Sequence, residues 1–336
     1  MSSKAGEPHE AWGVLNPGGV RAADGAMHLF PRLIAEGNYS RIGHVRVLFE
    51  GDVPVGVERL GIALEPHESY EVNAGGGGVE DPRIIYEPLL KRYVMTYTAF
   101  VPYEPRVAIA VSEDLYNWQR LGLLRYEVIP GEDDLNQCGN KDAALFPEII
   151  VDPEGVPSFA ILHRPTTRVQ LRHDGVDVTT PPSGEETREY IWISYIAVDA
   201  VLADIRALTS VRRHQRVMAA EQPWGNSKIG TGAPPVRLPY GWVMPYHGVS
   251  TASGHPRYCM GIAILDLENP ARILYRTPLP VLEPQTEYEC HGLSSDIVFP
   301  SASDLRPDGL LDIYYGAADR CIAAVRITLP SELPAP

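Results

Sequence analysis

A carboxylate stands in an unusual backbone setting near residue 80. The run Gly77-Gly78-Val79-Glu80-Asp81-Pro82-Arg83 places two acidic residues and an arginine around a proline, directly after a series of glycines. Glycine permits positive φ and a close approach of the backbone to a ligand, and proline fixes its own φ and removes a donor. These residue types predict a stiff corner that presents Asp81 for proton transfer. A surface turn with a solvated charge cluster is the alternative.

Further charged residues recur beside strand-like runs along the chain. Aspartates there suit proton transfer or the binding of sugar hydroxyls, and basic residues can hold phosphate or another oxyanion. The carboxylates are Asp81 and Asp319, and the cationic set is Lys141, Arg164, Lys228 and His247. Taken singly, each Lys or Arg is more often solvated than functional, and His247 could equally bond a buried backbone group. Their shared position in repeated units is the argument that they converge on one pocket.

Composition limits the partners of the chain. Its 336 residues are 44% hydrophobic, enough for one large domain or two smaller ones, and the net charge of −14 argues against nucleic acid or an anionic membrane as partner. No stretch approaches the roughly 18 to 20 apolar residues of a membrane span, and residues 1–7 lack the apolar segment of a signal peptide. We therefore expect a cytoplasmic protein. Because the ten histidines show no HxH or HExxH spacing and no CxxC pair occurs, we expect no metal site.

Strand-like runs come in pairs that repeat along the sequence. The pairs are Met27–Ile34 with Ile42–Phe49, Tyr93–Phe100 with Val107–Val111, Ser158–His163 with Tyr190–Val198, Trp242–His247 with Met260–Leu265, and Leu311–Gly316 with Cys321–Thr328. Units spaced by roughly 60 to 80 residues predict an all-β fold, a five-bladed β-propeller in a single domain over residues 1–336. A β-sandwich or two β domains are the alternatives. Only residues 200–208 suggest a short helix, and the polar segment at about 166–189 is expected to be an inserted loop or partly disordered flap.

Taken in order, these motifs resemble glycoside hydrolase family 130, the β-mannoside phosphorylases and related β-mannosidases. The resemblance covers nearly the whole chain. It rests on Asn16-Pro17-Gly18, Gly78-Val79-Glu80-Asp81-Pro82-Arg83, residues 141–148, Leu162-His163-Arg164-Pro165, residues 228–235, Gly241-Trp242, Tyr246-His247-Gly248-Val249, Leu282-Glu283-Pro284 and residues 314–319. The family has a five-bladed β-propeller fold, which agrees with the five units.

The resemblance implies roles for individual positions. Asp81 matches the general acid, which in phosphorylase members is thought to protonate the glycosidic oxygen through the 3-hydroxyl of the mannosyl unit. The residues that match sugar-binding positions of the −1 subsite are Asn16, Arg32 and Asp319. Those that match the phosphate site are Lys141, Arg164, Lys228 and His247, with Tyr246 beside them as a further substrate-binding residue.

One acid facing a basic cluster is the arrangement that an inverting phosphorylase needs. Phosphate is already an anionic nucleophile, so the protein must bring it to the anomeric carbon rather than activate water. We therefore expect phosphorolysis of a β-1,4- or β-1,2-mannoside to α-mannose 1-phosphate, with inorganic phosphate as co-substrate and no cofactor. The runner-up is an inverting β-mannosidase, whose second carboxylate would lie roughly 6.5 to 9.5 Å from the first, with Glu148 or Glu221 as the candidate. A non-catalytic carbohydrate-binding propeller is the third hypothesis.

Two departures from the family pattern bear on the substrate. Lys141 stands where phosphorylase members more often place an arginine, and lysine keeps the charge but loses the bidentate fork. Between Arg164 and Lys228 the chain also carries an insertion, which changes the rim expected to choose the acceptor sugar. The resemblance further implies a homo-oligomer that acts on a small oligosaccharide.

Overall fold

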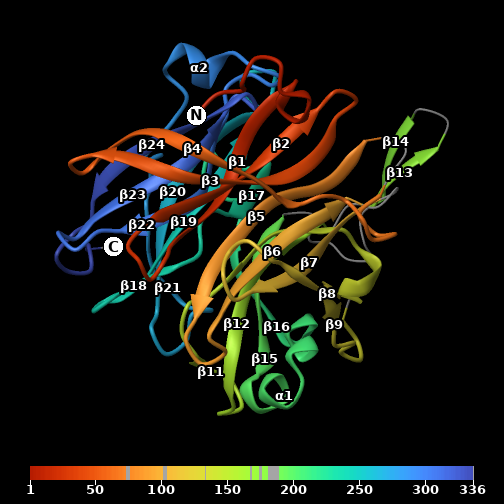
Figure 1. Ribbon diagram of the computed structural model, residues 1–336. Helices are drawn as coiled ribbons and strands as arrows, with labels where there is room; N and C mark the ends of the chain where they lie inside the picture. Colours follow the sequence, from red (N-terminus) through yellow and green to blue (C-terminus); the bar gives the residue numbers. More distant parts are fainter. Residues whose placement is uncertain are drawn as a thin grey trace.

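The protein is an all-β chain, as the sequence predicts. A computed structural model describes residues 1–72, 76–100, 104–132, 134–166 and 189–335, and the backbone of residues 169–173 and 176–180. Figure 1 shows strands in several sheets and short helices at their margins. The described helices are η1 (Pro8–Glu10), η2 (Leu135–Gln137), α1 (Val198–Ala203), η3 (Ile205–Thr209) and α2 (Glu287–Cys290).

The largest sheet consists of two antiparallel groups joined at a corner. The first group is β1 (Gly13–Arg21), β2 (Met27–Ala35), β3 (Tyr39–Glu50) and β4 (Val53–Leu64), and the second is β5 (Gly77–Glu87), β6 (Arg92–Phe100), β7 (Pro105–Ser112) and β8 (Gln119–Leu123). The groups meet where β3 and β5 run parallel, through the pairs Tyr39–Gly77 and Ser40–Gly78. In the described part of the chain, only these two residue pairs join the groups, and all other strand pairings of the sheet are antiparallel and lie within one group.

Three further sheets of three or more strands follow in sequence order among the described residues. The next contains β9 (Arg125–Tyr126), β10 (Asn140–Leu145), β11 (Ile150–Val151), β12 (Pro157–Pro165), β15 (Tyr190–Ala197) and β16 (Ser210–Ala219). After it come β17 (Lys228–Thr231), β18 (Val236–Leu238), β19 (Gly241–Ser250), β20 (Arg257–Leu265) and β21 (Ile273–Arg276), and then β22 (Val298–Leu305), β23 (Leu310–Ala317) and β24 (Cys321–Thr328).

The five pairs of runs expected from the sequence are all neighbouring antiparallel strands. They are β2 with β3, β6 with β7, β12 with β15, β19 with β20, and β23 with β24. The predicted short helix corresponds to α1 and η3. Within the predicted loop at 166–189, β13 (Val169–His173) and β14 (Val176–Thr180) pair as a two-stranded sheet, so part of this segment is a hairpin, and residues 167, 168, 174, 175 and 181–188 lie outside the described residues.

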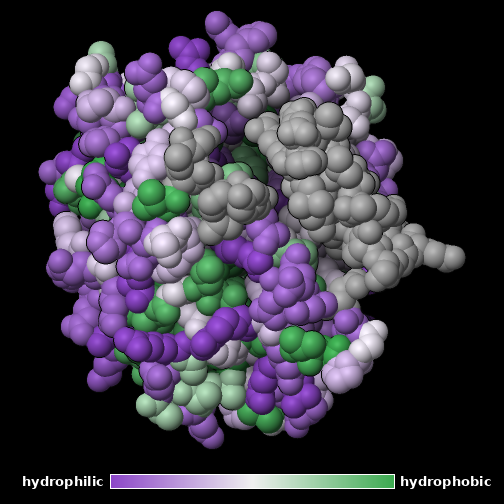
Figure 2. Space-filling view, turned by 90° about the vertical axis from the view of Figure 1, so that its right-hand side faces the viewer, coloured by the Kyte–Doolittle hydropathy of each residue, from purple (hydrophilic) through white to green (hydrophobic). Residues whose placement is uncertain are grey.

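The core lies between neighbouring sheets. Ile109 of β7 belongs to one buried cluster with Leu145 of β10 and Ile161 of β12, and Met260 of β20 belongs to another with Ile313 of β23. Such burial, worth about 1.5–3 kcal/mol for each large apolar side chain, holds each sheet against the next. The face drawn in Figure 2 is mostly hydrophilic, with hydrophobic residues in small separate groups. Among the described residues, no helix is long and apolar enough to cross a membrane.

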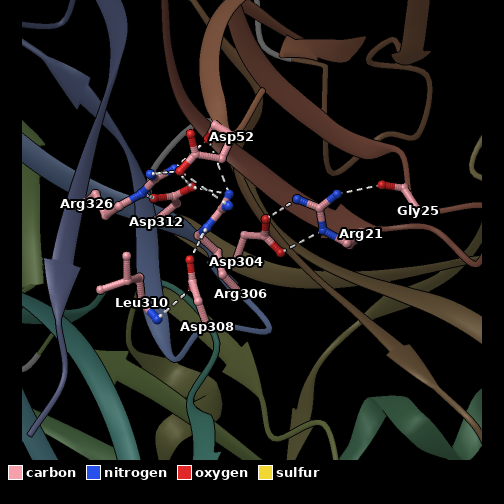
Figure 3. Close-up of polar contacts among 9 residues, drawn as sticks. All are labelled: Arg21, Gly25, Asp52, Asp304, Arg306, Asp308, Leu310, Asp312 and Arg326. Carbon is pink, nitrogen blue, oxygen red and sulfur yellow. Dashed lines mark hydrogen bonds and ion pairs between the residues drawn. The ribbon is translucent and has the colours of Figure 1, made fainter. Parts of the chain in front are cut away.

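Contacts between the two ends of the chain tie the first group of strands to the last sheet. The amino group of Met1 donates to the carbonyl of Ile322 at 2.6 Å, and the Ile322 amide donates back to Met1 at 2.9 Å. Asp52, in the turn between β3 and β4, meets Arg326 and Arg306, as Figure 3 shows. The same figure shows a further set of bonds in this seam, Arg326 with Asp312 and Arg21 with Asp304.

Candidate active site

The candidate site is built on strands whose ladders are interrupted at corresponding places. The register shifts between Leu15 and Gly18 in β1, between Glu80 and Arg83 in β5, between Lys141 and Ala144 in β10 and between Pro300 and Ala302 in β22. Inside these interruptions, three polar residues adopt positive φ: Asn16 (43°), Asp81 (46°) and Asp142 (53°). A bulge re-aims a side chain, and a non-glycine residue in this backbone region costs of order 1–3 kcal/mol. The strain therefore occurs where candidate functional side chains are presented.

A cavity of about 680 Å³ collects the predicted residues. All predicted site residues except Tyr246 line it: Asn16, Arg32, Asp81, Lys141, Arg164, Lys228, His247 and Asp319. The general acid candidate and the basic residues thus border one space instead of lying on opposite rims. The sequence placed these residues before or at the ends of strands, whereas the structure places Asn16, Asp81, Lys141 and Lys228 within β1, β5, β10 and β17.

Asp81 is held by two neighbours on one carboxylate oxygen. Its Oδ1 accepts hydrogen bonds from Nδ2 of Asn16 at 2.9 Å and from Nη1 of Arg32 at 3.4 Å. Arg32 also donates through Nη2 to Glu80 at 2.7 Å. Since Oδ1 is engaged by these donors, the orientation of the Asp81 carboxyl group at the cavity wall is fixed.

Asn16 depends on a glycine in a distant strand. A Cβ atom at Gly316 of β23 would lie 2.0 Å from Oδ1 of Asn16, so only glycine leaves room for this amide. Oδ1 of Asn16 is buried and accepts no hydrogen bond from the residues that the structure describes. An unsatisfied buried acceptor at a cavity wall is suited to a ligand hydroxyl.

Arg83, which follows Asp81 in the same motif, has a structural role. Its guanidinium is buried and donates through Nε to the carbonyl of Gly232 at 2.6 Å and through Nη1 to the carbonyl of Asp81 at 2.7 Å. Arg83 thereby joins β5 to the segment after β17 and satisfies the backbone at the strained Asp81.

Asp319 forms a second carboxylate on the acidic side of the cavity. It has a positive φ of 54° after β23. Burial raises the pKa of Asp319 and the charge of Asp81 acts in the same direction, while a hydrogen bond from Ser294 and the charge of Arg32 oppose them. Arg32 therefore acts on both carboxylates: it donates a hydrogen bond to Asp81, and its charge acts to lower the pKa of Asp319.

Arg164 is a buried cation at the cavity wall, and two carboxylates accept hydrogen bonds from it. Its Nε donates to Oδ2 of Asp142 at 2.9 Å, and its Nη1 donates to Oε2 of Glu189 at 2.9 Å. Burial acts to raise the pKa of Asp142, but positive neighbours led by Arg164 outweigh it and bring the value to about 2. Lys141, in β10, lies with Nζ 3.7 Å from Oε2 of Glu80. Arg164 and Lys141 thus each lie beside carboxylates, so the basic residues do not form a cluster of positive charge alone.

His247 is close to this group but is not a cation near neutral pH. Burial lowers its pKa to about 4, although Asp142 acts in the opposite direction, with Nε2 of His247 3.7 Å from Oδ2 of Asp142. The prediction of His247 as a member of the cationic set is therefore corrected: the imidazole is neutral. Gly230 makes the approach of His247 to Asp142 possible, because a Cβ atom at residue 230 would lie 2.3 Å from Oδ2 of Asp142.

Tyr246 does not line the cavity, contrary to its expected place beside the cations. Side chains alternate across β19, so that His247 faces the cavity while Tyr246 faces the core. Its ring stacks on Trp224 with centroids 5.5 Å apart, and its hydroxyl accepts a bond from Nε of Arg276 at 3.0 Å. Tyr258 of β20 lines the cavity instead.

Several cavity residues were missed by the sequence reasoning. These are Phe100, Asp142, Glu189, Tyr258 and Phe299, among others. Asp142 could have been found because it follows Lys141 directly, as Asp81 follows Glu80. Glu189 and Tyr258 carry no comparable local signal, since their place depends on contacts with remote strands.

The glutamates named for the hydrolytic alternative lie elsewhere. Glu148 and Glu221 are exposed and do not line the cavity, and Glu148 lies 3.3 Å from Nε of Arg237. Among the residues that the structure describes, no group of three or more His, Cys, Asp or Glu side chains is placed to hold a metal ion.

Comparison with known proteins decides the family. The model of glycoside hydrolase family 130, described as β-1,4-mannooligosaccharide phosphorylase, matches residues 2–332. The chain belongs to glycoside hydrolase family 130.

Relatives of this family 130 member include named phosphorylases. A 1,2-β-oligomannan phosphorylase of Thermoanaerobacter sp. (strain X514) is 27% identical, covering 89% of this chain and 84% of that protein. A β-1,2-mannobiose phosphorylase of the same organism is 29% identical, covering 76% and 69%. In fold, the chain is similar to the β-1,2-mannobiose phosphorylase of Listeria innocua, with a TM-score of 0.71 at 22% identity over 97% of this chain and 92% of that chain.

Proposed function

We propose that this protein is an inverting phosphorylase of β-mannosides, which transfers a mannosyl unit to inorganic phosphate and releases α-mannose 1-phosphate. The observation that carries the proposal is that Asp81, Arg164 and Lys228 line one cavity. Family membership and the names of the relatives support the same chemistry, with a β-1,2- or β-1,4-linked mannoside as substrate.

Asp81 supplies the proton to the leaving sugar. The bond between the anomeric carbon and the glycosidic oxygen breaks while a phosphate oxygen bonds to that carbon from the opposite face. The proton reaches the glycosidic oxygen through the 3-hydroxyl of the mannosyl unit. Asn16 and Arg32, which hold Oδ1 of Asp81, then stabilise the carboxylate that remains.

Asn16, Arg32 and Asp319 bind the mannosyl hydroxyls beside Asp81. Arg164, Lys228 and Lys141 bind the phosphate on the other side of the cavity, with neutral His247 and Tyr258 as further hydrogen-bonding groups at the wall. The alternation of Arg164 with Asp142 and Glu189 keeps a buried cation compensated before phosphate arrives. Phosphate is a co-substrate, and the reaction uses no cofactor.

The frame for this site is a five-bladed β-propeller. Its support is the division of the strands into five antiparallel groups: β1–β4, β5–β8, β10 with β12, β15 and β16, β17–β21, and β22–β24. The interrupted strands β1, β5, β10 and β22 would be the innermost strands of their blades. We further propose that the protein is a cytoplasmic homo-oligomer and that its substrate is a small oligosaccharide.

The deciding experiment measures products with and without phosphate. Incubation with β-1,2- and β-1,4-mannobiose should yield mannose 1-phosphate only when phosphate is present. In the reverse direction, α-mannose 1-phosphate together with mannose as the acceptor sugar should form a mannobiose and release phosphate, with little release when the acceptor is left out. Release of free mannose at the same rate with and without phosphate would favour the hydrolytic alternative. Sugar binding without any turnover would favour a carbohydrate-binding protein.

A further inference from the structure

Glu189 places a buried carboxylate against the candidate phosphate site. Its Oε2 accepts the 2.9 Å bond from Nη1 of Arg164, and its side chain is only 6% exposed. The backbone is anchored as well, because its carbonyl accepts from the amide of Ala220 at 3.0 Å just before β15 begins. Glu189 is thus fixed at the cavity wall.

An anion that reaches Arg164 must accommodate this carboxylate. Two donors of the guanidinium, Nε and Nη1, are already bonded to Asp142 and Glu189. The Asp142 carboxylate is engaged on its own side by Arg164, with Arg83 at 3.9 Å. In the part of the chain that the structure describes, Oε1 of Glu189 has no hydrogen-bond donor. Glu189 therefore offers an acceptor oxygen beside the donors that would bind the anion.

An acceptor of this kind distinguishes oxyanions by whether they carry a proton. Near neutral pH, inorganic phosphate and arsenate retain at least one proton, whereas sulfate has none. A protonated oxygen donates a charge-assisted bond to a carboxylate. A proton-free oxygen at the same place meets the like charge of the carboxylate and has no proton to donate to it, which is unfavourable.

We propose that Glu189 accepts a hydrogen bond from the protonated oxygen of hydrogen phosphate and thereby makes the site select phosphate over sulfate. This inference rests on the proposed phosphate site at Arg164 and Lys228. Arg164 and Lys228 attract either oxyanion, and Glu189 rejects the one that cannot donate.

The test compares the binding of phosphate, arsenate and sulfate by isothermal titration calorimetry at pH 7.5. In the wild-type protein, phosphate and arsenate should bind at least about tenfold more tightly than sulfate, since a charge-assisted hydrogen bond separates them. In Glu189→Gln, the amide can donate to sulfate, so the preference should fall by about tenfold, mainly through tighter sulfate binding. The exposed Glu148→Gln serves as the matched control and should keep the wild-type preference.

The outcomes separate this inference from the proposed function. Equal binding of sulfate and phosphate by the wild-type protein, or an unchanged preference in Glu189→Gln, would overturn the role of Glu189 while leaving the phosphate site standing. Binding of none of the three anions by the wild-type protein would remove the phosphate site, and the inference with it. Should Glu189→Gln not fold, the wild-type comparison still decides, because arsenate must group with phosphate and apart from sulfate.

Discussion

The side-chain amide of Asn16 donates a 2.9 Å hydrogen bond to Oδ1 of Asp81, and the two residues share one backbone conformation. Each has a positive φ, 43° and 46°, and each precedes a proline at an interruption of its ladder. Proline disfavours helical conformations in the residue before it, so both positions depend on their surroundings. The same strained backbone conformation therefore occurs twice. At Asp81 it presents the proposed acid to the cavity, and at Asn16 it positions the amide that bonds this acid.

Replacing Asp81 by Asn should abolish turnover while the fold is kept. The amide cannot donate a proton of suitable acidity, so kcat should fall by at least about a thousandfold, the scale of general acid catalysis. Initial rates of phosphorolysis and a thermal melt of the same preparation check this. Activity close to that of the wild type would refute the role of Asp81.

Replacing Gly316 by Ala should displace Asn16. The added Cβ would lie 2.0 Å from Asn16 Oδ1, so either the amide or β23 must move, and we expect kcat/KM to fall by about tenfold or more because Asp81 loses its holder. Gly56→Ala is the control, since the nearest atom to its Cβ would be 3.9 Å away. If Gly316→Ala and Gly56→Ala have the same kcat/KM, the tight approach has no bearing on catalysis.

Replacing Lys228 by Met should weaken phosphate binding more than it changes stability. Lys228 is exposed at the edge of the cavity, so little packing is lost, while removal of a cation should raise the KM for phosphate by about tenfold. Steady-state rates at varied phosphate and fixed mannoside measure this. The exposed Lys4→Met provides a comparison, and a KM for phosphate equal in both variants would contradict the assignment.

Acid should destabilise the protein partly through His163. This side chain is fully buried, its Nε2 lies 2.7 Å from the Ser194 hydroxyl, and burial lowers its pKa to about 3. The unfolded chain has a histidine pKa of about 6.5. Between these values the unfolded state binds one proton more, so the free energy of unfolding falls as the pH falls, by about 1.4 kcal/mol per unit for this residue.

Urea unfolding of the wild type and of His163→Gln between pH 7.5 and 5 tests this. The variant should be less stable at pH 7.5, since a buried hydrogen-bonded group has been altered, but it should lose about 2 kcal/mol less than the wild type between pH 7.5 and 5. His44 and His247, whose pKa values are also lowered to about 4, contribute equally to both proteins. Parallel losses in the two proteins would show that His163 is not the group that titrates.

The sequence by itself determined the strand pairs and most of the candidate site. Runs rich in Val, Ile, Tyr and Trp and bounded by turn residues are local information, and they located the five antiparallel pairs, such as β19 with β20. The ordered motifs around Asp81, Arg164 and Lys228 identified residues that line one cavity. Strands β1, β5 and β10 were harder to find because glycine, proline and charged residues interrupt their runs of strand-forming residues.

Only the tertiary structure decided which side of a strand faces the cavity and which charges survive there. Tyr246 and His247 are adjacent in sequence, yet one lies in the core and the other at the cavity, where burial makes it neutral. Glu189 reaches Arg164, and Gly316 makes room for Asn16, through contacts between strands far apart in the chain. Burial and electrostatic coupling depend on what surrounds a side chain in space, and a local sequence pattern does not contain that information.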